Sequence, residues 1–166
     1  DAPFGWPEKF TQAVVDWNHV SWDDDIRKKL CFRETDRQIQ ETLAIWPLSV
    51  SSDRIALPAM RTSSLLNRHG VKDRSGDGKF FEVYPAGSLR KWGLTFRNYK
   101  KDKPEHQQTR QEILNSLQEA LPWLDLPTSC ATTSHALDAL VESLTVKAAM
   151  QNRTIKPGAE QSILAK

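Results

Sequence analysis

The sequence contains few cysteines, and their scarcity excludes several classes of protein. Cys31 and Cys130 are the only two in 166 residues. They provide neither a disulfide framework nor the Cys-x-x-Cys spacing of a structural zinc site. The sequence shows no secretory signal peptide, and unpaired thiols are typical of a reducing compartment. We therefore expect a cytoplasmic protein.

Long hydrophobic runs, a strong charge bias and common nucleophile motifs are also missing. No apolar run approaches the roughly 18 residues that would span a bilayer, so we expect no membrane contact. The formal net charge of +2 does not by itself indicate a nucleic-acid partner. No Gly-x-Ser-x-Gly motif is present, and no pattern marks either cysteine as a nucleophile. A metal-independent hydrolase of small molecules is therefore weakly supported.

Apolar spacing predicts helices over much of the chain and one strand. Residues 104–121 and 134–144 carry apolar side chains at helical intervals, and Thr133 or Ser134 is a natural N-cap for the second helix. Residues 79–84 alternate as a strand does, with Glu82 on the face opposite Phe81 and Val83. A single strand leaves its backbone unpaired. We therefore expect further strands from upstream residues or from a partner chain.

The helix predicted over 134–144 has two different faces. One is an apolar stripe, and beside it His135, Asp138 and Glu142 follow at i, i+3 and i+7. That second face could hold a divalent metal or perform acid–base chemistry. The alternative is the solvated edge of an ordinary amphipathic helix.

A short segment after the predicted strand is strongly basic. Its basic residues are Arg90, Lys91, Arg97, Lys100, Lys101 and Lys103. They are opposed there only by Asp102 and are interleaved with Trp92, Phe96 and Tyr99. Basic side chains bind phosphates and aromatic rings stack on unpaired bases, so this segment is a candidate contact for DNA or RNA. The alternative is a solvated loop whose aromatic residues anchor it to the core.

Five segments, in this order along the chain, resemble the predicted ribonuclease-H-like nucleases of domain-of-unknown-function family 429. The segments are residues 1–7, 33–37, 47–55, 81–86 and 135–141. The resemblance implies an α/β fold, a ribonuclease-H-like mixed sheet flanked by helices. The domain would occupy residues 1–150 and lack its N-terminal strands, so that the chain as it stands is mostly helical, and residues 151–166 would form a C-terminal tail. His135 with Asp138 also looks like the His-x-x-Asp helix of Holliday-junction resolvases.

The resemblance also implies a site and a reaction. Asp1, Glu82 and Asp138 stand where acids of such a family would hold Mg²⁺ or Mn²⁺ for hydrolysis of nucleic-acid phosphodiesters. His135 would orient the attacking water, assist proton transfer or bind the product phosphate. Arg33, Asp36 and Arg54 are expected to form ion pairs near the site, an arrangement that is more often structural than catalytic.

The sequence departs from the family pattern at its first strand. That strand, which carries an expected metal-binding aspartate, is missing. The sequence therefore leaves open whether the chain is an enzyme. The alternative is a non-catalytic binding or assembly module that retains the ribonuclease-H-like fold.

Overall fold

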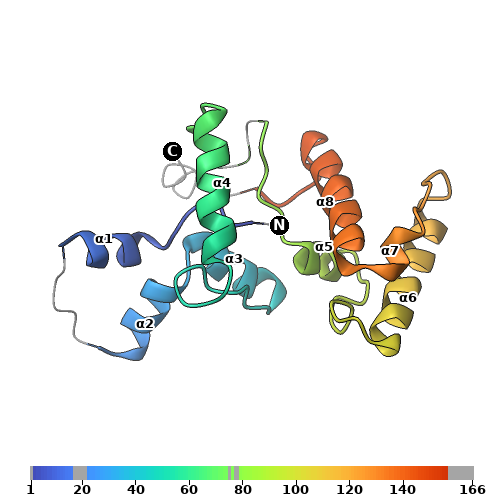
Figure 1. The fold of residues 1–166 in the computed structure, drawn as a ribbon, viewed down its shortest axis with the longest axis horizontal. Coiled ribbons are helices and arrows are strands. Elements are labelled where there is room, and N and C mark those ends of the chain that lie inside the picture. The colour runs from blue at the N-terminus through green and yellow to red at the C-terminus, as the bar shows by residue number, and fades with distance from the viewer. Residues whose placement is uncertain (1, 17–21, 75, 77–78, 157–166) are drawn as a thin grey trace. The chain divides into compact units, whose positions relative to one another are not determined.

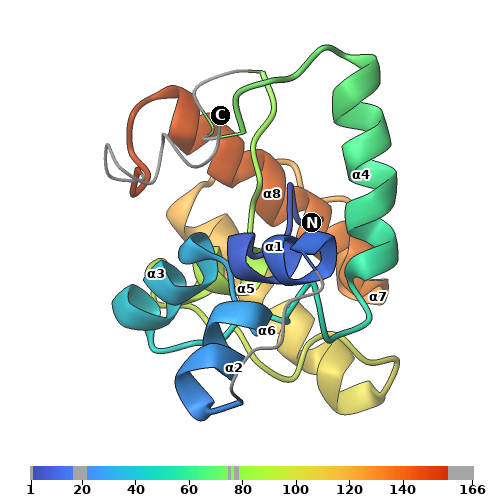
Figure 2. The ribbon, with the colours of Figure 1, turned by 90° about the vertical axis from the view of Figure 1, so that its left-hand side faces the viewer.

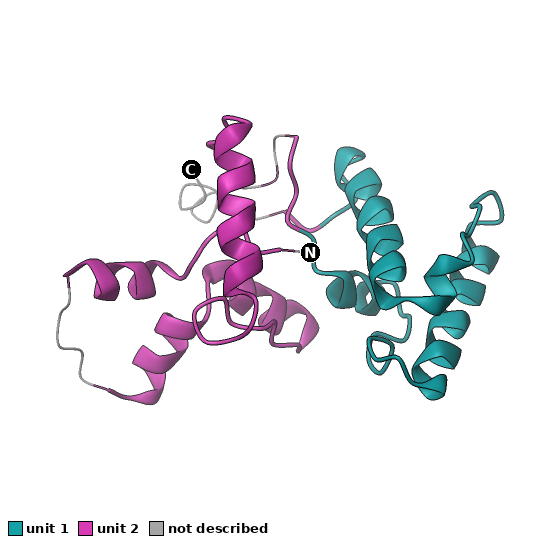
Figure 3. Ribbon diagram, in the orientation of Figure 1, with its two compact units in different colours: residues 1, 83–154 teal, residues 2–82, 155–166 magenta. Residues whose placement is uncertain are grey.

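The computed structural model describes residues 2–16, 22–74, 76 and 79–156. These residues form helices joined by loops and divide into two compact units (Figure 3). Of the described residues, 83–154 belong to unit 1, whereas 2–82 and 155–156 belong to unit 2. Each unit is described by itself below.

Unit 2 contains the first helices of the chain. They are α1 (Glu8–Asp16), α2 (Asp24–Cys31), α3 (Glu34–Leu43) and α4 (Ala56–Arg68). Helices α1 and α2 pack against each other (Figures 1 and 2). Asp23 caps α2 by accepting a 2.8 Å hydrogen bond from the Ile26 N–H. Neither α1 nor α2 contributes a buried residue, so their packing supplies little of the unit's core.

The buried part of unit 2 is small and partly polar. Val50, Ala59 and Leu66 are buried together with the polar residues Asp36 and Ser49. A buried carboxylate is costly unless it is paired and hydrogen-bonded. The polar contacts around Asp36 are therefore central to this unit, and they are described with the candidate site.

Unit 1 contains the later helices of the chain. They are α5 (Pro85–Lys91), α6 (Pro104–Ala120), α7 (Ser129–Thr132) and α8 (Ser134–Met150). The short α7 packs on both α6 and α8, and α5 packs on α8 (Figure 1). Thr133 caps α8 through a 3.2 Å bond from the Ala136 N–H to its hydroxyl, which confirms the predicted cap.

The core of unit 1 is made by the helical stripes that the sequence predicts. Leu137 and Val141 of α8 are fully buried against Ile113 and Leu117 of α6 and against Leu89 of α5. A strand is not needed to close this core, because the helices cover one another's apolar faces.

The predicted α/β fold is wrong for the part of the chain that the structure describes. Residues 2–16, 22–74, 76 and 79–156 contain no strand, so no ribonuclease-H-like mixed sheet forms. Residues 80–84 have no regular secondary structure and precede α5. The physical reason is pairing: this segment has the alternation of a strand, but no second segment among the described residues offers it a ladder of hydrogen bonds.

Two further expectations concern membrane contact and the tail. Among the described residues, no helix has both the length and the apolar character needed to cross a bilayer. Of the predicted tail 151–166, only residues 151–156 are described. The predicted domain boundary at 150 coincides with the end of α8 at Met150, but the assignment of residues 1–150 to one domain stays a prediction.

Candidate nucleic-acid interface

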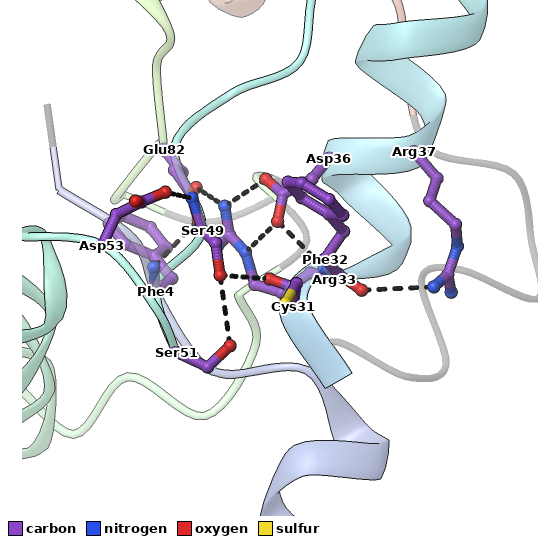
Figure 4. Close-up of polar contacts among 10 residues, drawn as sticks. All are labelled: Phe4, Cys31, Phe32, Arg33, Asp36, Arg37, Ser49, Ser51, Asp53 and Glu82. Atoms are coloured by element: carbon purple, nitrogen blue, oxygen red, sulfur yellow. Dashed lines mark hydrogen bonds and ion pairs between the residues drawn. The ribbon is translucent and has the colours of Figure 1, made fainter. Parts of the chain in front are cut away.

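Glu82, a predicted metal ligand, is bound by groups of its own unit. Arg33 donates to both carboxylate oxygens, with 2.9 Å between Nη1 and Oε2 and 2.7 Å between Nη2 and Oε1 (Figure 4). The Phe4 backbone N–H also donates to Oε2 at 2.9 Å. The Glu82 carboxylate therefore joins two segments of unit 2 that lie far apart in the sequence.

The same arginine binds Asp36, which is fully buried. Arg33 Nε lies 3.0 Å from Asp36 Oδ2, and Nη2 lies 2.8 Å from Oδ1. Burial lowers the pKa of Arg33, but the hydrogen bonds to Asp36 and the charge of Glu82 outweigh it and raise this pKa above its ordinary value. The guanidinium stays charged between two carboxylates. The predicted Arg33–Asp36 pair is confirmed, whereas Arg54 is exposed.

A serine-rich turn lies beside this cluster and closes it with polar contacts. Ser49 donates its backbone N–H to Asp53 Oδ2 at 2.7 Å and its hydroxyl to the Cys31 carbonyl at 2.6 Å (Figure 4). The Ser51 hydroxyl donates to the Leu30 carbonyl at 2.7 Å. These bonds satisfy the last carbonyls of α2, so the turn has a structural role.

Asp138, the acid singled out on α8, is buried in unit 1 and held by two side chains. The Tyr99 hydroxyl donates to Oδ1 at 2.8 Å, and the Lys100 ammonium lies 3.1 Å from Oδ2. The two other polar residues of the predicted face differ, since His135 is exposed and Glu142 is half-buried. The face is therefore not a uniform solvated edge, because one of its three members is enclosed.

Tyr99 is the side chain that fixes this arrangement. The residue is only 1% exposed. Burial is the larger cause and the negative charge of Asp138 the next, and both raise the pKa of Tyr99 above its ordinary value near 10. The phenol therefore remains protonated and continues to donate to Asp138 at neutral pH.

Arg110 organises the neighbouring loop, and the sequence analysis missed it. The residue is 1% exposed, and its guanidinium donates to four backbone carbonyls. Nη1 reaches the carbonyls of Tyr99 at 2.6 Å and Lys101 at 3.1 Å. The remaining two bonds go to the carbonyls of Ala131 and Thr132 in the short helix α7, before α8. A signal was available: Arg110 occupies the position three residues before Ile113, within the apolar stripe of α6.

Three consecutive carbonyls of the basic segment are thus bound by side chains of two buried residues. Arg110 holds those of Tyr99 and Lys101, and the Ser134 hydroxyl donates to that of Lys100 at 3.3 Å. With its carbonyls bound from α6 and α8, the loop presents Lys100 and Lys101 on a fixed backbone. Both lysines are exposed.

The aromatic residues of the basic segment have different environments. Tyr99 is a core residue, Phe96 packs on the core from its edge, and Trp92 is 38% exposed. The guanidinium carbons of Arg90 and Arg97 lie 4.9 and 5.1 Å from the centre of the Phe96 ring. Tyr99 therefore anchors the loop to the core and Trp92 stays at the surface, while the contact with DNA or RNA stays a prediction.

Comparison with known sequence families assigns the chain. The profile of the family described as "Protein of unknown function (DUF429)" matches residues 1–162. The chain belongs to DUF429. This match confirms the membership in family 429 that the resemblance indicates. It assigns no activity, because the family is described as one of unknown function. No curated protein and no solved structure shows a match to this DUF429 chain.

The three acids that the resemblance implies as metal ligands do not share a cluster within one unit of this DUF429 chain. Among residues 2–16, 22–74, 76 and 79–156, no group of three or more His, Cys, Asp or Glu side chains is arranged to hold a metal ion. Glu82 belongs to unit 2 and Asp138 to unit 1, and each is bound by cationic side chains of its own unit. Asp1 lies outside the described residues. A Mg²⁺ site needs several oxygen ligands on one ion, so the assignment of Asp1, Glu82 and Asp138 to a metal stays a prediction.

Proposed function

We propose that this DUF429 chain binds nucleic acid through the basic segment of unit 1, residues 90–103, without cleaving it. The observation that carries this proposal is the loop with three bound carbonyls, which presents exposed lysines on a fixed backbone. Phosphate contacts from such side chains supply most of the affinity for a nucleic-acid backbone. A loop ordered before binding loses less conformational entropy on binding, and this raises its affinity.

The distribution of charge in the segment supports the same proposal. Arg97, Lys101 and Lys103 are exposed at separate positions of the loop, and Lys91 is exposed at the end of α5. The only acid within 90–103 is Asp102. A local excess of positive charge attracts a polyanion even though the whole chain carries a formal net charge of only +2.

Metal-dependent hydrolysis of phosphodiesters, with Mg²⁺ or Mn²⁺ as cofactor, is the competing function implied by the family resemblance. It would use the same partner, DNA or RNA, so the two functions differ in the fate of the bound strand. It would also require Asp138 to exchange Lys100 for a metal ion, whereas our proposal leaves this ion pair as a structural feature of the loop. Within our proposal the chain acts in the cytoplasm, in keeping with the free thiols of Cys31 and Cys130.

One experiment separates these functions. Fluorescence anisotropy of an end-labelled oligonucleotide is measured in EDTA, and the recovered strand is then sized by gel after incubation with Mn²⁺. We expect saturable binding in EDTA and an intact strand with Mn²⁺. Absence of binding would refute the proposal. Cleavage that needs Mn²⁺ and disappears in Asp138→Asn would establish the hydrolase instead.

A further inference from the structure

The outer edge of the basic segment brings two guanidinium groups close to one aromatic ring. The guanidinium carbons of Arg90 and Arg97 each lie about 5 Å from the centre of the Phe96 ring, at 4.9 and 5.1 Å. Phe96 itself is half-buried and packs against the unit 1 core. The ring is therefore fixed to the core, and it holds two cationic planes near the surface.

The end of α5 brings these groups together. Gly93 has φ +75°, and the Leu94 N–H reaches back to the Leu89 carbonyl at 2.9 Å while the Gly93 N–H bonds the Arg90 carbonyl at 3.0 Å. This pair of bonds is a Schellman motif, which terminates a helix and reverses the chain. The reversal returns Phe96 to the last turn of α5, next to Arg90.

The same motif places Trp92 at the surface. Trp92 is the C-cap of α5 and 38% exposed, whereas most large apolar side chains of this unit belong to its core. An indole and two guanidinium planes within eight consecutive residues, 90–97, exceed what phosphate binding requires. Lysines alone would satisfy phosphates, since a phosphate needs charge and donors but no planar surface.

Planar aromatic and guanidinium groups bind the faces of unpaired bases. These faces are covered by neighbouring base pairs in a duplex and are accessible in a single strand. We propose that residues 90–97 contact unpaired bases, so that unit 1 prefers single-stranded nucleic acid to a duplex. This inference rests on the proposed function and specifies its ligand. Phosphates would bind at Lys100, Lys101 and Lys103, and bases would bind at Trp92, Arg90 and Arg97.

The test compares two labelled oligonucleotides with the same number of phosphates, one unstructured and one folded as a duplex hairpin. Anisotropy is measured in EDTA at a fixed salt concentration. We expect the single strand to bind at least about fivefold more tightly, the low end of what stacking contributes per base. Equal affinity for both forms, or tighter binding of the hairpin, would overturn this inference and leave the proposed function standing. If neither form binds, both fall.

Charge-preserving variants isolate the planar groups. The double variant Arg90→Lys and Arg97→Lys keeps the net charge but removes the guanidinium planes, so we expect it to lose most of the preference for the single strand. The matched control is Arg61→Lys with Arg68→Lys, two exposed arginines of α4 in unit 2, which should retain the preference. Circular dichroism verifies that both variants are folded. A preference unchanged in the first variant, or lost equally in the control, would overturn the assignment to Arg90 and Arg97.

Discussion

The Lys100 ammonium lies 3.1 Å from Asp138 Oδ2, so the basic loop is joined by an ion pair to the buried acid of α8. Lys100 is half exposed, whereas the Asp138 side chain is 12% exposed. The ammonium is therefore shared between Asp138 and the solvent, from which a phosphate would approach. If the loop only binds nucleic acid, removing the charge of Asp138 should increase its affinity. If Asp138 holds a catalytic metal ion, the same change should abolish cleavage.

Asp138→Asn should bind an oligonucleotide more tightly than the unmodified chain. The asparagine oxygen can still accept from the Tyr99 hydroxyl, so the loop should keep its position, while Lys100 loses one carboxylate that competes with phosphate. An ion pair with one exposed partner contributes about 0.2–1 kcal/mol, which corresponds to an increase of up to roughly fivefold in affinity. Fluorescence anisotropy in EDTA measures this change in affinity. Weaker binding by this variant would contradict the role given to Lys100.

Arg110→Met should destabilise unit 1 strongly. The variant fills a similar volume but leaves the carbonyls of Tyr99, Lys101, Ala131 and Thr132 without their donor. Each buried unsatisfied group costs about 1–3 kcal/mol, so we expect the free energy of unfolding to fall by about 3 kcal/mol or more. Urea unfolding followed by circular dichroism measures it.

The matched control for Arg110 is Arg68→Met, because Arg68 is exposed at the end of α4. A surface substitution of this kind changes stability by no more than about 0.5 kcal/mol. Arg110→Lys should fall between these two variants, since one ammonium cannot reach all four carbonyls. Equal stability of the Arg110→Met and Arg68→Met variants would refute the stabilising role given to the four hydrogen bonds of Arg110.

Stability should decline at alkaline pH because of Tyr99. Its pKa is raised in the folded chain, so the hydrogen bond to Asp138 is fully present below the ordinary tyrosine pKa of about 10. Above that pH the unfolded chain loses its phenolic proton first. Unfolding then becomes easier by about 1.4 kcal/mol for each further pH unit, until the folded phenol also ionises.

The difference between the unmodified chain and Tyr99→Phe isolates this effect from other groups that titrate near pH 10. Urea unfolding at pH values from about 8 to about 11 should show a shallower decline for Tyr99→Phe. Tyr84→Phe removes the only other tyrosine and should keep the steeper decline. Parallel curves for the unmodified chain and Tyr99→Phe would show that the Tyr99 phenol does not titrate as its burial requires.

Glu82→Gln should weaken unit 2 without affecting nucleic-acid binding. Glutamine can still accept from the Phe4 N–H, but the two charge-assisted bonds to Arg33 are lost. Arg33 keeps its bonds to Asp36, so we expect a loss of only about 1–3 kcal/mol in the free energy of unfolding. If the variant instead abolished binding of Mn²⁺ by the chain, Glu82 would be a metal ligand.

The helices of unit 1 follow from the sequence, because apolar spacing and burial agree there. The intervals of Leu137 and Val141 correctly identify the buried stripe of α8, and Thr133 its cap. The strand at residues 79–84 was predicted wrongly for a physical reason. The alternation of apolar and polar side chains indicates which of them face inward. A strand also needs a second strand to pair with, and that pairing depends on residues distant in the sequence.

The candidate site could be predicted only in part. The composition of residues 90–103 identifies the basic segment, and the spacing on α8 singles out Asp138. The partners of Asp138 could not be found in this way, since Tyr99 and Lys100 lie almost forty residues away and reach it only through tertiary packing. Arg110 was missed because an arginine in a helix is usually a surface residue. Its position in the apolar stripe of α6 indicates burial, but its four carbonyl partners depend on tertiary packing.

The salt dependence of oligonucleotide binding tests the central claim most directly. The unmodified chain is compared with the triple variant Lys100→Gln, Lys101→Gln and Lys103→Gln, and with the charge-matched control Arg61→Gln, Arg68→Gln and Lys72→Gln in unit 2. Each lost phosphate contact reduces the slope of log K against log salt by about 0.7 for a single strand. We predict that the first variant loses roughly two units of slope while the control keeps the unmodified value. An unchanged slope in the first variant, or an equal loss in both, would contradict nucleic-acid binding by the basic segment.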